Sequence, residues 1–263
     1  IGNCSPAAVA GRGVMTRFIP ILAPIFGALS ILAAWQFLLP LSGVPAYIAP
    51  TPTKIIAVFF TQTDLIASNF LPTATEALAG FFFGNLAAVL FAILFAYARF
   101  IRMAYFPVVL FFNTIPILAL SPIIILIFGL GMTPKIIIAA IICFFPTLVN
   151  MIRGLASATA NEEELFRMLS ANKFETFMRL HLPRSLPMLF SSLRIATATA
   201  VIGAIVGEWI GADKGLGALI IQATFNYQSD KLYAAIVASS SLSIAMFALV
   251  ALVEARVMRG WER

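Results

Sequence analysis

Long apolar runs without a charged side chain alternate with short charged segments along the chain. Such runs cover residues 18–53, 77–98, 103–134 and 232–253. Each exceeds the roughly 20 apolar residues that a helix needs to cross a bilayer, and globular cores do not produce such stretches in series. The pattern predicts an all-α, polytopic membrane protein of about six transmembrane helices, at residues 18–39, 73–97, 105–130, 135–152, 186–211 and 232–254.

Polar residues near the starts of these helices support the assignment. Thr73 and Glu76 have the spacing of a capping box, in which a hydroxyl and a carboxylate satisfy backbone N–H groups at a helix start. Thr133-Pro134 places a cap residue before a proline at the first helical position. Thr51-Pro52 is the same pair, and it predicts a short helix in the loop after the first span.

Composition excludes an ordinary soluble protein. Hydrophobic residues make up 61% of the chain and charged residues 11%, whereas soluble domains carry about a quarter charged residues. The net charge of +6 does not predict nucleic-acid binding, because the basic residues are dispersed between apolar runs. Cys4 and Cys143 lie far apart and His181 is the only histidine, so the sequence predicts no catalytic residues and no metal site.

One membrane domain accounts for most of the chain. Met15 opens a more natural start than Ile1, so residues 1–16 are predicted to be an N-terminal extension without an assigned fold. Residues 17–259 form a single transmembrane domain that contains one charged cytoplasmic loop, residues 161–183. The apolar stretch after Arg17 is longer than a signal-peptide core, so it is predicted to be a retained helix.

The placement of Lys and Arg predicts the orientation, since cytoplasmic loops are enriched in both. With both termini cytoplasmic, twelve basic residues face the cytoplasm and four face outward, while Arg194 lies inside a span. The twelve are Arg12, Arg17, Arg99, Arg102, Arg153, Arg167, Lys173, Arg179, Arg184, Arg256, Arg259 and Arg263. The four are Lys54, Lys135, Lys214 and Lys231.

The charged loop has the pattern of a helix, a turn and a second helix. Asn161 with Glu164 and Asn172 with Glu175 each have the spacing of an N-terminal cap, and Pro183 is predicted to stop the second helix. Both helices carry an apolar stripe. The stripes consist of Leu165, Phe166, Leu169, Phe174, Phe177 and Met178. Such short helices are marginal alone, so either the protein's own spans or a partner protein must cover the stripes.

This loop resembles the coupling loop of the permeases of ATP-binding-cassette (ABC) importers. The family pattern is Glu-Ala-Ala, three residues, Gly, then about nine residues before a hydrophobic-x-Leu-Pro end. Here Glu164-Leu165-Phe166, Ser170 and Leu180-His181-Leu182-Pro183 occupy those positions, with bulk replacing the small residues. The resemblance implies that the loop contacts an ATPase through Glu163, Glu164, Leu165, Phe166, Arg167, Ser170, Ala171, Asn172, Leu182 and Pro183.

The resemblance extends over residues 48–259. Over these residues the chain is similar to the permeases that transport sulfonates, taurine, nitrate and thiamine precursors. The resemblance is carried by Tyr47–Thr53, Ile115–Pro122, Phe128–Gly131, Phe145-Pro146 and Gly215–Gly217. It implies the type I importer permease fold in a bacterial inner membrane, a second permease copy, and an extracytoplasmic binding protein. It also implies an ABC ATPase dimer that binds ATP and Mg²⁺, and this chain, which lacks a phosphate loop, is then a transport subunit and not an enzyme.

Polar groups inside the spans are candidates for the translocation path. Asn113 and Thr114 precede Pro116 in the third span, where freed backbone groups predict a kinked, cavity-lining helix; otherwise Thr114 bonds back to its own helix. Asn150 gives the fourth span a similar feature, and Glu208 lies near the outer end of the fifth. For Glu208 a structural hydrogen bond to a neighbouring span is the alternative.

Two further interpretations stay open. An ion-coupled secondary transporter would use Glu208 or Arg194 and need no ATPase. The substrate of an importer would be a thiamine precursor or related heterocycle, or a sulfonate-like anion, with the Gly207–Ala212 stretch favouring the heterocycles. Gly80 and Gly84 are predicted to let another helix approach the second span, and Gly211–Gly217 is predicted to be an outward turn that contacts a binding protein.

Overall fold

Helices make up nearly all of the structure, a computed structural model that describes residues 7–45 and 47–261. The helices are α1 (Ala7–Leu41), α2 (Pro52–Thr61), α3 (Thr63–Tyr97), α4 (Arg99–Thr114), α5 (Ile117–Phe128), α6 (Met132–Leu155), α7 (Ala160–Met168), α8 (Lys173–Thr176), the π-helical turn η1 (Phe177–His181), α9 (Leu182–Glu208), α10 (Leu216–Phe225) and α11 (Ser229–Trp261). The predicted all-α fold is confirmed.

Apolar helices occur at each predicted span. Within the described residues, five helical stretches are long and apolar enough to cross a bilayer, and the bent pair α4–α5 makes a sixth if its two helices count as one broken span. The two members of this pair meet at an angle of 103°. The multi-pass membrane architecture is therefore confirmed, and the kink predicted in the third span is a sharp break at Ile115 and Pro116.

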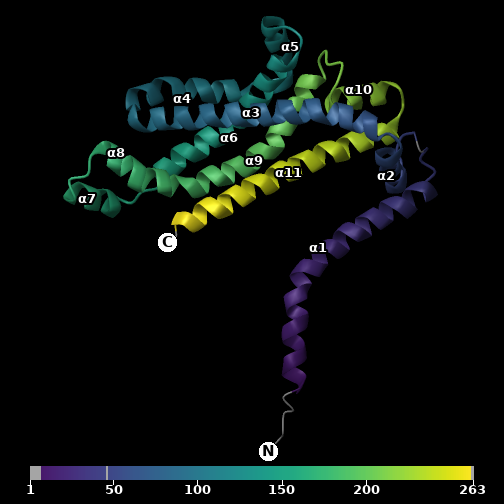
Figure 1. The fold of residues 1–263 in the computed structure, drawn as a ribbon, viewed down its shortest axis with the longest axis horizontal. Coiled ribbons are helices and arrows are strands. Elements are labelled where there is room, and N and C mark those ends of the chain that lie inside the picture. Colours follow the sequence, from purple (N-terminus) through teal and green to yellow (C-terminus); the bar gives the residue numbers. More distant parts are fainter. Residues whose placement is uncertain (1–6, 46, 262–263) are drawn as a thin grey trace, which may run out of the picture.

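The spans form an elongated bundle with different ends. In Figure 1, α3, α4, α6, α9 and α11 run side by side, α7 and α8 lie at one end, and α2 and α10 lie at the other. Helix α1 stands apart from the bundle, and no residue of its most apolar window, within Ala23–Leu41, is buried. It touches the bundle through Gln36, whose side chain hydrogen-bonds to Thr53 at 3.2 Å.

Small residues set the close approach of the central helices. A Cβ on Gly84 would strike the backbone of Ala140, and one on Gly203 would lie 2.5 Å from the Cα of Ala139. Gly80 packs against Ala139 in the same way. These contacts draw α3 and α9 onto α6, which confirms that Gly80 and Gly84 serve helix packing.

Some helix starts differ from the prediction. Thr51 and Pro52 begin α2 as predicted. The predicted cap at Thr73 is wrong, because α3 begins at Thr63 and continues through Thr73 and Glu76. Helix α6 begins at Met132 after Gly131, so Thr133 lies inside it. Helix α1 begins at Ala7, inside the predicted extension.

Candidate functional site

The connection between α6 and α9 is the most charged surface feature of the bundle. Helix α7 opens with a capping box in which the side chain of Thr159 accepts from the N–H of Glu162, and Glu162 accepts from the N–H of Thr159. The predicted cap at Asn161 and Glu164 is therefore wrong by two positions. Both pairs have the required spacing, and the contact of Glu162 with Arg184, an ion pair, favours the observed one.

Ser170 ends α7 in a left-handed conformation, with φ of 56°. The N–H of Ala171 donates to the carbonyl of Phe166 at 3.0 Å, and that of Ser170 donates to the carbonyl of Arg167 at 2.9 Å. These two bonds form a Schellman motif, whose left-handed residue is usually glycine. The turn predicted at Ser170 is therefore present. Its left-handed backbone is the reason why a glycine would suit this position.

The second short helix begins where the sequence predicts and ends later than it predicts. Asn172 and Glu175 form a reciprocal capping box at the start of α8. Pro183 does not stop the helix: it directly follows the π-helical turn η1, and α9 continues beyond it. The chain runs from α8 through η1 into α9 with no intervening loop.

The apolar side chains of this connection divide into two groups. Phe177 and Leu182 pack against the buried cluster around Phe95 and Met151. The others face outward: Leu165 is 53% exposed, Met168 79%, Leu169 69% and Phe174 66%. We call these four residues the α7–α8 apolar face. Nothing in the described part of the chain covers it.

Specific contacts tie α7 and η1 to the membrane helices. Arg184, in the first turn of α9, pairs with Glu162 of α7. Nδ1 of His181 lies 3.1 Å from the carbonyl oxygen of Leu155 at the end of α6. The rings of Tyr97 in α3 and Phe177 in η1 meet edge to face at 5.7 Å. A force applied to α7 would therefore reach α3, α6 and α9.

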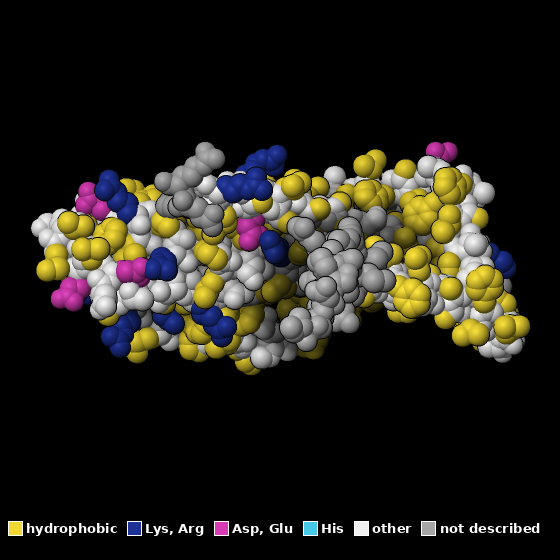
Figure 2. All heavy atoms as spheres, turned by 90° about the horizontal axis from the view of Figure 1, so that it is seen from below, with side chains coloured by type: hydrophobic (Ala, Val, Ile, Leu, Met, Phe, Trp, Pro, Cys, Tyr) yellow, Lys and Arg dark blue, Asp and Glu magenta, His cyan; other side chains and the backbone are white. Residues whose placement is uncertain are grey.

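The remaining predicted coupling residues lie on the same surface. Glu164 and Asn172 are exposed, while Phe166 and Ala171 are half-buried. Glu163 pairs with Arg167 one helical turn later at 3.5 Å. Figure 2 shows Lys and Arg side chains mainly over the half of the molecule that carries α7 and α8 in Figure 1. The predicted residues are thus together at the basic end.

At the opposite end, a buried polar cluster holds the start of α10. The N–H groups of Gly215, Leu216 and Gly217 donate to three side chains from other helices. Asn69 accepts the first at 2.9 Å, Thr73 the second at 2.8 Å and Glu208 the third at 2.6 Å. Thr73 also donates to Glu208 at 2.6 Å. We call Asn69, Thr73 and Glu208 the α10 latch.

An ion pair lies one turn from the latch. Lys135 donates to Glu76 at 3.0 Å, and both side chains are buried. Sequence reasoning assigned Lys135 to the outer surface and missed the role of Asn69. Asn69, Thr73 and Glu76 fall on one face of α3, and this spacing of polar residues within an apolar span was the available signal.

The predicted path residues do not form one cluster. Asn113 lines a cleft, Pro116 precedes α5, and Thr114 bonds back to the carbonyl of Phe111 at 2.7 Å. Asn150 donates to the carbonyl of Pro146 in its own helix at 3.0 Å. Glu208 is held in the latch.

Arg194 lies elsewhere, paired with Glu254 at 2.5 Å. Glu208 and Arg194 therefore have separate partners, as their spacing predicts.

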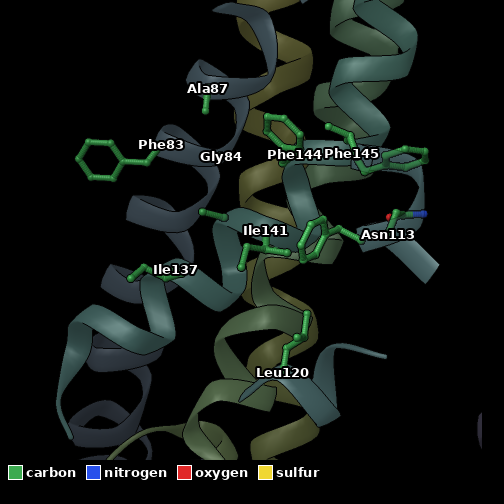
Figure 3. A pocket seen from close by; sticks show the side chains of 12 residues that line it. Phe83, Gly84, Ala87, Asn113, Leu120, Ile137, Ile141, Phe144 and Phe145 are labelled. Carbon is green, nitrogen blue, oxygen red and sulfur yellow. The ribbon is translucent and has the colours of Figure 1, made fainter. Parts of the chain in front are cut away.

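The cleft beside Asn113 has a volume of about 400 Å³. It is bounded by α3, α4, α5 and α6, at the break between α4 and α5. Figure 3 shows Phe83 and Ala87 of α3 on one side, Asn113 on the other and Ile141 between them. Of the predicted path residues, Asn113 lines this cleft, whereas Thr114 and Pro116 are not among its lining residues.

Comparison with known proteins gives consistent matches. Residues 80–259 match the family model described as "Binding-protein-dependent transport system inner membrane component". The chain is 31% identical over 250 residues to the formylaminopyrimidine transport permease protein ThiX of Halalkalibacterium halodurans, covering 95% of this chain and 99% of that protein. It is 32% identical to the riboflavin transport system permease protein RibX of Chloroflexus aurantiacus, covering 88% and 87%.

A more distant relative and a solved structure extend the comparison. The putative aliphatic sulfonates transport permease protein SsuC of Bacillus subtilis is 28% identical, over 87% of this chain and 84% of that protein. A chain of the methionine ABC transporter MetNI, solved in an inward-facing conformation, matches with a TM-score of 0.57 and 20% identity, covering 76% of this chain and 97% of that one. The structural match shows the fold, that of the type I ABC importer permease.

Proposed function

Because this chain belongs to the family of binding-protein-dependent transport system inner membrane components, we propose that its α7–α8 apolar face is the surface on which a separate ATPase docks. The chain itself is the membrane permease of an ABC importer, a transport subunit with no catalytic role of its own. Family membership gives no support to an ion-coupled secondary transporter.

The exposure of Leu165, Met168, Leu169 and Phe174 at the basic end carries the docking proposal. Apolar side chains that face water do not stabilise a short helix. A partner groove that covers them removes their apolar surface from water, and this burial favours binding. The ATPase dimer would bind ATP and Mg²⁺, because this chain has no phosphate loop. Glu163, Glu164 and Arg167 would form the polar rim of the contact.

Closure of the ATPase dimer would act on the spans through the ties already described. Arg184 and His181 connect α7 and η1 to the start of α9 and the end of α6. Those two helices pack closely, since a Cβ on Gly154 would lie 2.9 Å from the Cα of Ser185. Nucleotide-driven movement of α7 would therefore rock α6 and α9 as a rigid unit.

Charge and exposure support an orientation and an assembly. The basic end that carries α7 and α8 would face the cytoplasm of a bacterial inner membrane, and both termini would lie on that side. An identical second permease copy and lipid would cover the unburied apolar surface of α1. An extracytoplasmic binding protein would deliver the solute to the opposite end, near α2 and α10.

The solute class is proposed from the relatives and from the chain itself. Two of the relatives above 30% identity are named for a formylaminopyrimidine and for riboflavin, both nitrogen heterocycles, and the sulfonate relative is less similar. We therefore propose a thiamine precursor or a related heterocycle in preference to a sulfonate-like anion. Asn113, Thr114 and Pro116 would line its path, and the place of Asn150 and Glu208 on that path stays a prediction.

Co-purification tests this proposal. The permease is expected to bring down an ABC ATPase and to support ATP-dependent uptake in proteoliposomes with its binding protein. The double variant Glu164→Arg with Ser170→Glu places a wrong charge and a strained residue on the docking surface, so it should abolish both results. Intact ATPase association and uptake in that variant would show that α7 does not couple the two proteins.

A further inference from the structure

The cleft at the α4–α5 break has the size of a small-molecule site. Its volume of about 400 Å³ lies within the roughly 300–1,000 Å³ that is usual for ligand pockets. The break places non-helical backbone at Ile115 and Pro116 inside a span. At membrane depth such backbone is tolerated only where it is buried in protein or lines a water-filled cavity, which favours a solute path over a lipid groove.

Aromatic rings form much of the cleft wall. Phe112 comes from α4, Phe83 from α3, and Phe144 and Phe145 from α6. The rings have aliphatic neighbours, among them Leu120 and Ile141. Aromatic rings favour stacked or edge-to-face contact with other rings, so this wall suits a flat ring system.

Asn113 is the one side chain in the described lining that carries a hydrogen-bonding group. Its amide offers two donor hydrogens and an acceptor oxygen. The amide is exposed and makes no hydrogen bond within the part of the chain that the structure describes. In Figure 3 Asn113 lies beside the cleft opposite Phe83. A solute with both ring nitrogens and donor groups would satisfy this amide.

The cleft holds no charged lining residue. The two basic residues nearest to span interiors are already paired, Lys135 with Glu76 and Arg194 with Glu254. An anion that entered this apolar cleft would lose its hydration shell, and no cation in the cleft would compensate for that loss. The free-energy cost of such a transfer is high. A sulfonate-like solute is therefore disfavoured here on local charge.

We propose that the cleft is a transit site for an uncharged, planar nitrogen heterocycle, which stacks on Phe112 and Phe144 and hydrogen-bonds to Asn113. This proposal rests on the importer function and adds the chemistry of the path. Stacking provides affinity that tolerates different rings, while the single amide orients the solute. The absence of charge excludes anionic solutes that a binding protein might release nearby.

The test uses the complete complex of permease, ATPase and binding protein in proteoliposomes. The probe is the solute extracted from the purified binding protein and identified by mass spectrometry, then supplied in labelled form. Two matched pairs of variants distinguish residues that line the cleft from residues that are exposed elsewhere. They are Phe112→Leu against Phe111→Leu, and Phe83→Leu against Phe82→Leu. In each pair both rings are exposed to a similar degree, and only the first lines the cleft.

The expected solute is a neutral nitrogen heterocycle. Phe112→Leu and Phe83→Leu should each lower uptake about three- to tenfold, while their neighbours leave it unchanged. Asn113→Leu should lower it by roughly tenfold, and Asn113→Gln should recover part of the loss. Binding-protein-stimulated ATP hydrolysis, measured in every variant, shows whether the complex is assembled.

Two results would overturn the transit site. The first is an aliphatic anion as the extracted solute, and the second is equal uptake by the lining and the control variants in complexes that hydrolyse ATP normally. If the importer proposal itself were wrong, the result would differ from both of these. The unmodified complex would then neither hydrolyse ATP in response to the binding protein nor accumulate solute. A lipid in the cleft would give the equal-uptake result, whereas a second copy in the cleft would lower ATP hydrolysis together with uptake in the lining variants and would likewise overturn the transit site.

Discussion

Thr73 and Glu208 are far apart in the sequence, yet the hydroxyl of Thr73 donates to Oε1 of Glu208 at 2.6 Å in a buried site. The same hydroxyl oxygen accepts the N–H of Leu216, and Oε2 of Glu208 accepts that of Gly217. A carboxylate at the N-terminus of a helix is also favoured by the helix dipole. These two residues thus hold α10 against α3 and α9.

Loss of the latch should destabilise the outer end of the bundle. Thr73→Val removes a donor to Glu208 and the acceptor of Leu216, so it leaves a buried carboxylate and a buried N–H unsatisfied. We expect a cost of about 2–4 kcal/mol and a lower thermal unfolding temperature in detergent. Thr73→Ser keeps the hydroxyl and should stay within about 1 kcal/mol of the unchanged protein. Equal stability of the two variants would contradict the latch.

Glu208→Gln isolates the contribution of a single acceptor. One oxygen of the amide can still accept from Thr73, but the NH₂ group cannot accept from Gly217. The variant should lose about 1–3 kcal/mol, and hydrogen exchange should rise selectively over the first turn of α10. Unchanged exchange at Gly217 would mean that Glu208 does not cap this helix.

The buried pair of Glu76 and Lys135 gives a prediction by double-mutant cycle. Glu76→Gln leaves the ammonium of Lys135 buried without its counter-charge, at a cost of about 3–5 kcal/mol. Lys135→Met alone leaves the carboxylate of Glu76 unpaired and should cost a similar amount. The double variant should be more stable than either single variant, because neither member of this pair is left without the other. Additive losses would show that the two residues do not interact.

The left-handed conformation of Ser170 predicts the effect of two substitutions at the end of α7. Ser170→Gly removes the steric cost of positive φ and should stabilise the turn by about 1 kcal/mol. Ser170→Val places a β-branched side chain there and should destabilise it by a similar amount or more. Hydrogen exchange at Ser170 and Ala171 reports the change, and faster exchange in the glycine variant would be contrary to this account.

Sequence reasoning located the spans because their signal is local. Apolar length predicts a crossing helix without reference to any neighbour, and Asn172 with Glu175 is a cap that depends only on adjacent backbone. The effect of a proline was harder to predict: Pro116 separates α4 from α5, whereas helical structure continues through Pro183 after the π-helical turn η1. The difference depends on the backbone before the proline, which the proline itself does not reveal.

The latch could not be predicted, because its partners are distant in sequence. Thr73 and Glu76 have the spacing of a capping box, and only the upstream turns of α3 show that they are interior residues. The polar groups of these interior side chains then need hydrogen-bonding partners from α6, α9 and the start of α10. Likewise, Thr159–Glu162 and Asn161–Glu164 are equivalent as patterns, and the position of Arg184 distinguishes them.

In our proposal the α7–α8 apolar face couples the permease to an ATPase. The most direct test compares Leu169→Ser with Met103→Ser, since both side chains are 69% exposed but only Leu169 lies on that face. Leu169→Ser is expected to weaken ATPase binding to the purified permease by about tenfold or more, while Met103→Ser leaves it unchanged. Unchanged binding in Leu169→Ser, or an equal loss in both variants, would contradict it.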